Sequence, residues 1–282
     1  MRVRAFLVGL LTVFLLTACT ATPVQSGGVS ATTAPVAQFA SAITRGTDIP
    51  VTQIITDSVS CLHDYSLTVR QMQALEQSDV ILLSGGGLEE FMEDVLDSAE
   101  TVVDCGAGIS LRMTGDGEPD PHIWLDPQNA MVMAENICNT LTEVYPQWEE
   151  VFRANTDDLL TKLQELDDYG RRTLADLSCR KLITFHDGFA YLAHAYDLKL
   201  LRAVEEEAGS EASAESLMEI IALVQTNSLP AVFTEANGST SAASVIKAET
   251  GVSVFTLDMA MGGRDYFEAM THNFDTLKEA LQ

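Results

Sequence analysis

The stretch Lys181-Leu-Ile-Thr-Phe-His-Asp-Gly188 is a short apolar run that ends in a histidine and a turn. A helical pattern follows over residues 188–196, and a second apolar run covers residues 198–203. Alternation of strand, helix and strand is typical of a parallel sheet that is covered by helices and has right-handed crossovers. We therefore expect an α/β fold in which the carboxyl ends of the strands meet at one crevice.

The same alternation continues on both sides of this stretch. Towards the C-terminus, the pattern predicts strands at 231–234 and 252–257, with helices at 214–226, 241–250 and 266–281. Towards the N-terminus, it predicts strands at 28–34, 51–56, 80–83 and around Val102, with helices at 35–45, 66–77 and 87–98. Each set is expected to form a lobe around a parallel sheet whose two faces are covered.

A long helical pattern separates the two sets. It runs from Pro127 to about Leu177 and is broken mainly at Pro146, because proline cannot continue a helix. We expect two α/β lobes, residues 29–145 and 178–282, joined by a linking helix over residues 146–177 that serves as a spine.

The N-terminus has the features of a bacterial secretion signal. Two arginines precede an apolar stretch over residues 5–16 that is too short to span a bilayer as a stable helix. The stretch leads into Leu16-Thr-Ala-Cys19, where small residues precede a cysteine that can be acylated. We expect residues 1–18 to be a lipoprotein signal peptide, Cys19 the acylated N-terminus and residues 19–28 a flexible tether. An ordinary signal peptide with an incidental cysteine is the alternative.

The charge of the chain limits its partners. It has 16 Lys and Arg against 41 Asp and Glu, a formal net charge of -25. Such a surface repels phosphate backbones and anionic lipids. We expect no nucleic-acid partner, contact with the membrane only through the lipid anchor at its outer face, and a monomer.

Four further cysteines, Cys61, Cys105, Cys138 and Cys179, make an even number in a chain that is expected to reach an oxidising compartment. Four cysteines allow three pairings, of which Cys61 with Cys105 and Cys138 with Cys179 are favoured by their positions in the two halves. A thiolate metal site is the rival interpretation, but none of these cysteines has C-x-x-C spacing.

Four candidate metal ligands follow apolar, strand-like runs. They are His63, His122, His186 and Asp258. Each has a structural alternative: His122 can belong to a packed turn with Trp124 as a core residue, and Asp258 can be a turn cap. Because parallel strands bring their carboxyl ends together, the four can converge on one ion. His194 and His272 lie in predicted helices and are expected to be surface or packing residues.

These residues carry a resemblance to a known family. The chain, from about Val29 to Gln282, resembles the metal-specific solute-binding lipoproteins of bacterial ABC importers, and more closely the zinc members. The matching motifs are His63-Asp-Tyr65, Asp120-Pro-His-Ile-Trp-Leu-Asp-Pro127, His186-Asp-Gly-Phe-Ala-Tyr-Leu-Ala193 and the acidic Asp258 after the last strand. Glu235, in Phe233-Thr-Glu235, fits the family pattern as a residue near the site, as does Trp124.

The resemblance implies a high-affinity zinc receptor that delivers one ion to a membrane permease. His63 and His122 would come from the first lobe, and His186 and Asp258 from the second. Four protein ligands leave no open position for an activated water, so we expect no enzyme activity. Three imidazoles and a carboxylate suit zinc, whereas similar manganese members carry a glutamate at the position of His186. The histidine-rich loop of many zinc members is replaced here by the acidic stretch 110–120.

Three alternatives remain at this stage. One is a manganese or other divalent-metal receptor of the same family. Another is a secreted zinc hydrolase with Asp258 or Glu235 as general base, although no H-E-x-x-H motif is present. The third is a cell-adhesion protein that uses the metal only structurally.

Overall fold

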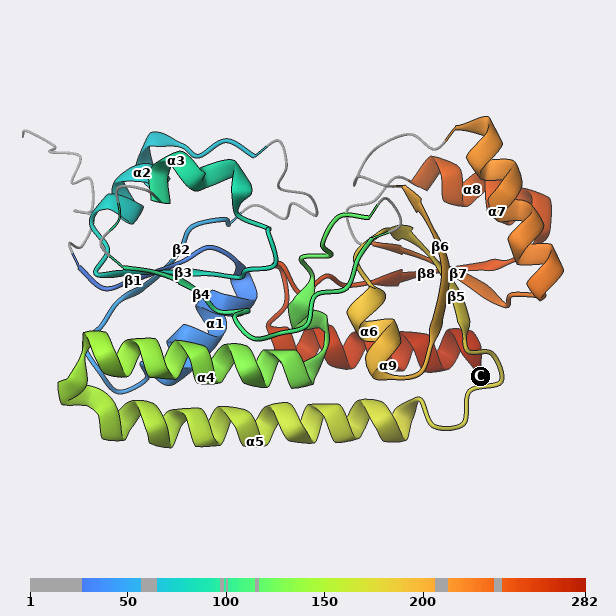
Figure 1. Ribbon diagram of the computed structural model, residues 1–282. Helices are drawn as coiled ribbons and strands as arrows, with labels where there is room; N and C mark the ends of the chain where they lie inside the picture. Colours follow the sequence, from blue (N-terminus) through green and yellow to red (C-terminus); the bar gives the residue numbers. More distant parts are fainter. Residues whose placement is uncertain are drawn as a thin grey trace, which may run out of the picture.

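The computed structural model describes residues 27–56, 65–96, 99, 101–114, 117–205, 213–235 and 240–282. The expected signal peptide, Cys19, Cys61 and His63 lie outside these residues. Figure 1 shows two lobes side by side, each built around one sheet, with long helices packed along them. Two α/β lobes joined by a helical spine were the prediction, and the fold confirms it.

The N-terminal lobe contains a parallel sheet with the strand order β2-β1-β3-β4. The strands are β1 (Val29–Ala31), β2 (Val51–Gln53), β3 (Val80–Leu83) and β4 (Val102–Asp104). The helices are α1 (Ala34–Ile43), α2 (Val69–Glu76), the 3₁₀ turn η1 (Glu90–Met92) and α3 (Glu93–Leu96). Thr68 and Gln71 form a capping box that fixes the start of α2. One helix was expected over residues 87–98, but residues 87–96 form a turn followed by η1 and α3.

The C-terminal lobe repeats this architecture with the strand order β6-β5-β7-β8. Its strands are β5 (Lys181–His186), β6 (Lys199–Glu205), β7 (Ala231–Glu235) and β8 (Ser253–Leu257). Its helices are α6 (Ala190–Ala195), α7 (Ala214–Asn227) and α8 (Thr240–Thr250). The central strand β5 is buried after Lys181, as expected for a strand covered on both faces. His186 is its last residue and so lies at the carboxyl end of this strand, as expected.

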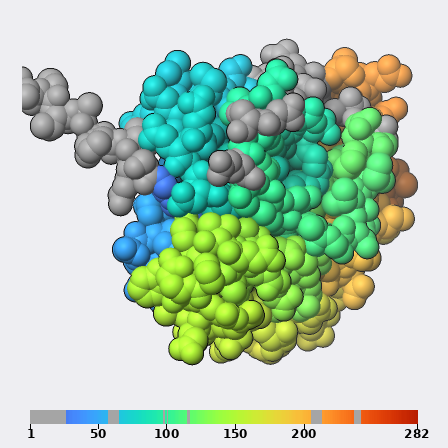
Figure 2. Space-filling view, turned by 60° about the vertical axis from the view of Figure 1, so that its left-hand side comes forward, coloured from blue at the N-terminus to red at the C-terminus, as the bar shows by residue number. Residues whose placement is uncertain are grey.

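Three long helices join the lobes. They are α4 (Pro127–Val144), α5 (Glu149–Thr173) and α9 (Tyr266–Leu281), and the 3₁₀ turn η3 (Pro146–Trp148) connects the first two. Pro146 stands where the helical pattern was expected to break. α5 packs against α1 of one lobe and α9 of the other. Figure 2 shows the N-terminal lobe, in blue to teal, lying directly on the yellow-green surface of α4 and α5.

The expected Cys138–Cys179 disulfide is wrong, and Cys61, the expected partner of Cys105, lies outside the described residues. Cys105, Cys138 and Cys179 are free thiols, and Cys105 and Cys138 are buried in the core. Cys138 lies near the end of α4 that turns into α5, whereas Cys179 follows the far end of α5. A helix of 25 residues carries the chain about 37 Å, but a disulfide needs Cα atoms within about 7 Å. The buried thiols pack as small apolar side chains. The positions of cysteines in a sequence do not distinguish this role from disulfide formation.

Within the described part of the chain, no helix combines the length and the apolar character that crossing a membrane requires.

Candidate metal centre

Two of the predicted ligands meet where the lobes face each other. The Nε2 atoms of His122 and His186 lie 3.2 Å apart, and the two rings are perpendicular with centroids 4.9 Å apart. His122 precedes the 3₁₀ turn η2 (Ile123–Leu125), which leads into α4, and His186 ends β5. The segment from β4 to α4 runs between the lobes in Figure 1. The fold thus brings together two histidines that are 64 residues apart.

Asp120 fixes the orientation of His122. Its Oδ1 accepts hydrogen bonds from the backbone N–H of His122 at 2.9 Å and from the ring Nδ1 at 2.7 Å. Because a carboxylate can only accept, this contact assigns the ring proton to Nδ1 and leaves Nε2 with a free lone pair. Asp120 is completely buried, and its Oδ2 has no hydrogen-bond partner among the described residues.

His186 is held in its neutral form. Burial, and then the neighbouring His122, lower the pKa of its ring from 6.5 to about 3. The Nε2 atoms of the two rings face each other, and the buried Nδ1 of His186 has no hydrogen-bond partner in the described chain. Two buried imidazole rings whose Nε2 atoms face each other are an arrangement suited to a metal ion.

Asp258 lies at the start of the loop between β8 and α9. Asn273 of α9 bonds to both backbone groups of Asp258, accepting from its N–H at 2.7 Å and donating to its C=O at 2.8 Å. The carboxylate accepts from the backbone N–H of Ala260 at 2.8 Å and from Arg264 Nη1 at 2.7 Å. Asp258 is therefore an anchored acidic residue whose two oxygens both have donors.

The loop after Asp258 reaches the histidines through its next residue. A Cβ atom on Gly188 would lie 2.6 Å from Cδ2 of His186 and 2.7 Å from Cε of Met259. Only glycine leaves room for Met259 to sit this close to the ring. Trp124 Nε1 donates to the carbonyl of Met259 at 2.8 Å, and Tyr266 OH donates to the carbonyl of Trp124 at 2.7 Å. Trp124 is thus both a core residue and a link from His122 to the loop of Asp258.

A further link crosses from the second lobe to Asp120. Tyr191 of α6 donates its hydroxyl to the Asp120 carbonyl at 3.1 Å and accepts from the backbone N–H of Arg112 at 2.9 Å. The acidic stretch 110–120 therefore has its two ends bonded to the helix that follows His186, through Arg112 and Asp120. Asp120 itself serves the histidine and is not part of an acidic surface.

The remaining predicted residues lie at different places relative to the histidine pair. Glu235 is buried at the end of β7, in register with Leu257, directly before Asp258. His194 is exposed, and His272 contacts the carbonyl of Thr256, so neither belongs to the histidine pair. In the described residues no group of three or more His, Cys, Asp or Glu side chains is arranged to hold a metal. The full set of four ligands thus stays a prediction.

Sequence reasoning missed the supporting residues Asn273 and Arg264. The Asp120-Pro121-His122 spacing could have indicated the carboxylate that orients the histidine. Arg264 and Asn273 follow Asp258 by 6 and 15 residues, and no sequence pattern that we considered connects them to it.

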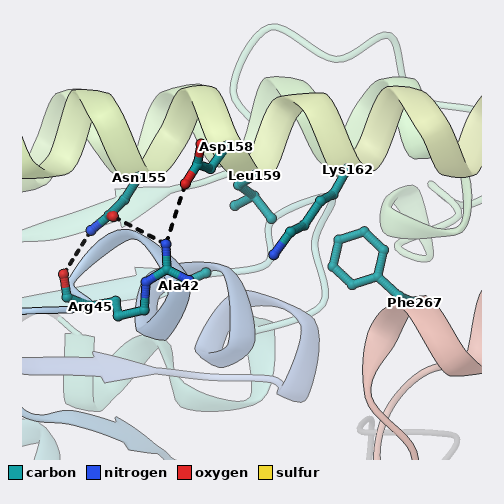
Figure 3. Close-up of a pocket in the computed structure, with 7 residues that line it drawn as sticks. All are labelled: Ala42, Arg45, Asn155, Asp158, Leu159, Lys162 and Phe267. Carbon is teal, nitrogen blue, oxygen red and sulfur yellow. Dashed lines mark hydrogen bonds and ion pairs between the residues drawn. The ribbon is translucent and has the colours of Figure 1, made fainter.

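A small pocket of about 60 Å³ lies elsewhere, between α1, α5 and α9. Figure 3 shows Arg45 bonded to Asn155 and Asp158 at its rim, with Lys162 and Phe267 beside them. The Arg45–Asp158 pair is exposed and contributes little to stability. None of the candidate ligands lines this pocket.

The chain is similar to proteins of metal uptake. The model of the family ZnuA, zinc-uptake complex component A, periplasmic, matches residues 29–280. The zinc-binding protein AdcA of Streptococcus pyogenes serotype M1 is 26% identical over 251 residues, which cover 77% of this chain and 49% of AdcA. The chain therefore spans about half the length of that relative.

In two further comparisons, the match covers a larger share of the other protein. The iron-binding protein YfeA of Yersinia pestis is 30% identical over 212 residues, covering 72% of this chain and 68% of YfeA. A crystal structure of ZnuA superposes with a TM-score of 0.82 at 27% identity and covers 91% of this chain and 99% of that one. On the extent of the family match, the chain belongs to the family of periplasmic zinc-uptake components.

Proposed function

We propose that this chain is an extracytoplasmic receptor that binds one zinc ion between its lobes and delivers it to the permease of an ABC importer. The observation that carries the proposal is the 3.2 Å distance between the Nε2 atoms of His122 and His186. Two imidazole nitrogens that share a tetrahedral zinc ion at about 2.05 Å lie about 3.4 Å apart. The two rings are thus spaced for one ion with little movement of the backbone.

The proposed ligands are His63, His122, His186 and Asp258. His122 and Asp258 are linked through Trp124 and Met259, and His63, outside the described residues, completes the set by its match to the family motif. Glu235 lies next to the site as a neighbour of Asp258. Four protein ligands close the coordination sphere, which favours capture of the ion over catalysis.

The protein prepares the two histidines for binding. Asp120 keeps the proton of His122 on Nδ1, so Nε2 faces the ion with a lone pair. The lowered pKa of His186 keeps its ring neutral until the pH approaches about 3. At His186, metal binding therefore displaces no proton from an imidazolium at neutral pH, and competition by protons at this residue is confined to strongly acid conditions.

We also propose the placement and division of the chain. Residues 1–18 act as a signal peptide, Cys19 carries the lipid, and residues 19–28 tether the protein to the outer face of the cytoplasmic membrane as a monomer. The first lobe comprises residues 29–145, the linking helix 146–177 and the second lobe 178–282. The sequence of the N-terminus and the periplasmic description of the family support this placement.

The test is a competitive calorimetric titration of the chain from Cys19 onward with zinc and with manganese. The wild type is expected to bind one zinc ion tightly. His186→Glu should bind zinc at least tenfold more weakly and manganese relatively better, because a carboxylate is the harder ligand. His194→Ala, which changes an exposed histidine of the same lobe, is the matched control and should bind zinc as the wild type does.

Either of two results would contradict the proposal. Absence of tight zinc binding by the wild type would reject the receptor function. Manganese or iron bound in preference to zinc would reject the metal assignment and place this chain functionally with relatives such as the iron-binding YfeA.

A further inference from the structure

The carboxylate of Asp258 is already held by a cation that belongs to the protein. Arg264 Nη1 donates to its Oδ2 at 2.7 Å, a charge-assisted hydrogen bond, while its Oδ1 accepts from Ala260 N–H at 2.8 Å. An incoming divalent cation therefore meets a carboxylate whose negative charge is paired. Binding through Oδ2 has to displace the guanidinium or share the oxygen with it.

The backbone of Asp258 does not need to move in this exchange. Asn273 fixes both of its backbone groups to α9, so the main chain stays in place while the side chain changes partner. Since α9 also carries Tyr266, which bonds to the Trp124 carbonyl, this anchor is tied to the segment of His122. Only side-chain rotation and a shift of Arg264 are required.

Arg264 is placed to withdraw from the carboxylate. Its side chain is 46% exposed, whereas that of Asp258 is 10% exposed, so a released guanidinium enters water and not the interior. The residues before it, Gly262 and Gly263, have φ values of 158° and 85°. Gly263 allows a backbone conformation that other residues rarely adopt, and Asp265 caps α9 directly after Arg264. Arg264 thus lies between two glycines and the N-cap residue of α9.

We propose that Arg264 sets the affinity of the metal site by competing with the ion for Asp258. This inference rests on the proposed function. When zinc binds, the Asp258–Arg264 ion pair breaks and an Asp258–zinc bond forms. When zinc leaves, the guanidinium returns to the carboxylate, so that Asp258 is never left as an unpaired, nearly buried charge. Arg264 lowers the affinity of the loaded state and assists release to the permease.

The test is zinc affinity of the chain from Cys19 onward, measured by competition with a chelator of known affinity. Arg264→Ala should bind zinc about tenfold more tightly, since the ion no longer has to break a charge-assisted pair. Arg264→Gln provides a second variant and should tighten binding in the same direction. Arg202→Ala is the matched control, because Arg202 is equally exposed at 44%, lies in the same lobe and pairs with Glu219. It should leave zinc affinity unchanged.

A double-mutant cycle tests whether Arg264 acts through Asp258. In an Asp258→Asn background, Arg264→Ala should no longer tighten binding. A gain of the same size in that background would indicate a general effect of charge and overturn the inference. Weaker zinc binding by Arg264→Ala would also overturn it, because Arg264 would then position the carboxylate. If the wild type binds zinc and both Arg264 variants bind it with the same affinity, the competition is rejected but the proposed function stands. If the wild type binds no zinc, the proposed function is rejected as well.

Discussion

At the scale of single residues, two buried acidic side chains lie behind the segment that carries His122. Asp120 holds the ring of His122 directly. Glu89 acts one step further away: it accepts from Thr32 Oγ1 at 2.6 Å and from the backbone N–H groups of Ser84 and Gly85 at 2.7 and 3.1 Å. The glycine turn that it anchors lies against Pro121, the residue before His122. Glu89 thus supports a turn that packs beside the segment of His122.

Glu89 gives a pH-dependent prediction. Burial raises the pKa of its carboxyl from 4.5 to about 7, against the three donors that lower it. The folded state therefore binds this proton more readily than the unfolded state, so the stabilising contribution is complete below pH 4.5 and is lost as the pH rises through 7. Between pH 4.5 and 8, wild-type stability should fall by about 3 kcal/mol relative to Glu89→Gln, which cannot ionise.

Urea unfolding of both proteins at several pH values measures this difference. Glu90→Gln, one position along and on the first turn of η1, is the control and should follow the wild type. A stability difference between wild type and Glu89→Gln that does not change with pH would show that folding leaves the pKa of Glu89 unshifted, and would contradict the prediction.

At the scale of elements, the close packing of α5 depends on a glycine. A Cβ atom on Gly170 would lie 2.8 Å from Phe274 Cζ and 2.8 Å from Tyr196 Cε1, so the helix backbone rests directly on two aromatic rings. Gly170→Ala gains about 1 kcal/mol in helix propensity but overpacks this contact at a cost of about 1–3 kcal/mol. We expect a net loss of stability and a lower midpoint of thermal unfolding.

The control for this change lies on the same helix. Thr161 is exposed, and Thr161→Ala should leave the midpoint unchanged or raise it slightly. A Gly170→Ala protein at least as stable as the wild type would mean that the rings give way without cost, and that α5 is not held by this contact.

The elements were largely predictable from sequence, and the reasons for the exceptions are physical. Buried parallel strands such as Val80–Leu83 and Lys181–His186 leave apolar runs, and Pro146 marks the break between two helices. His122 and His186 were found because they follow such runs. Arg264 was not, because an ion pair between two residues of an irregular loop leaves no periodic pattern. Pairing of the cysteines was predicted from their even number, but buried free thiols give the same number, so the sequence does not distinguish the two.

At the scale of the whole molecule, the lobes are not independent folding units. One hydrophobic core contains Val29 and Phe39 from the first lobe together with Leu182, Phe233 and Phe274 from the second. A second, smaller core around Ile183, Ile220 and Ile246 lies entirely within the C-terminal lobe. Because the larger core crosses between the lobes, we expect both to unfold in one cooperative transition.

Zinc should stabilise this whole unit. An ion held by both lobes binds the folded state and not the unfolded one, so at a free concentration a thousand times the dissociation constant it adds about 4 kcal/mol to the free energy of unfolding. Differential scanning calorimetry with and without zinc should therefore show one transition that moves upward as a whole. His186→Ala should retain the single transition but lose most of the shift. Two transitions, of which zinc moves only one, would mean that the ion is held within one lobe and that the paired histidines do not form its site.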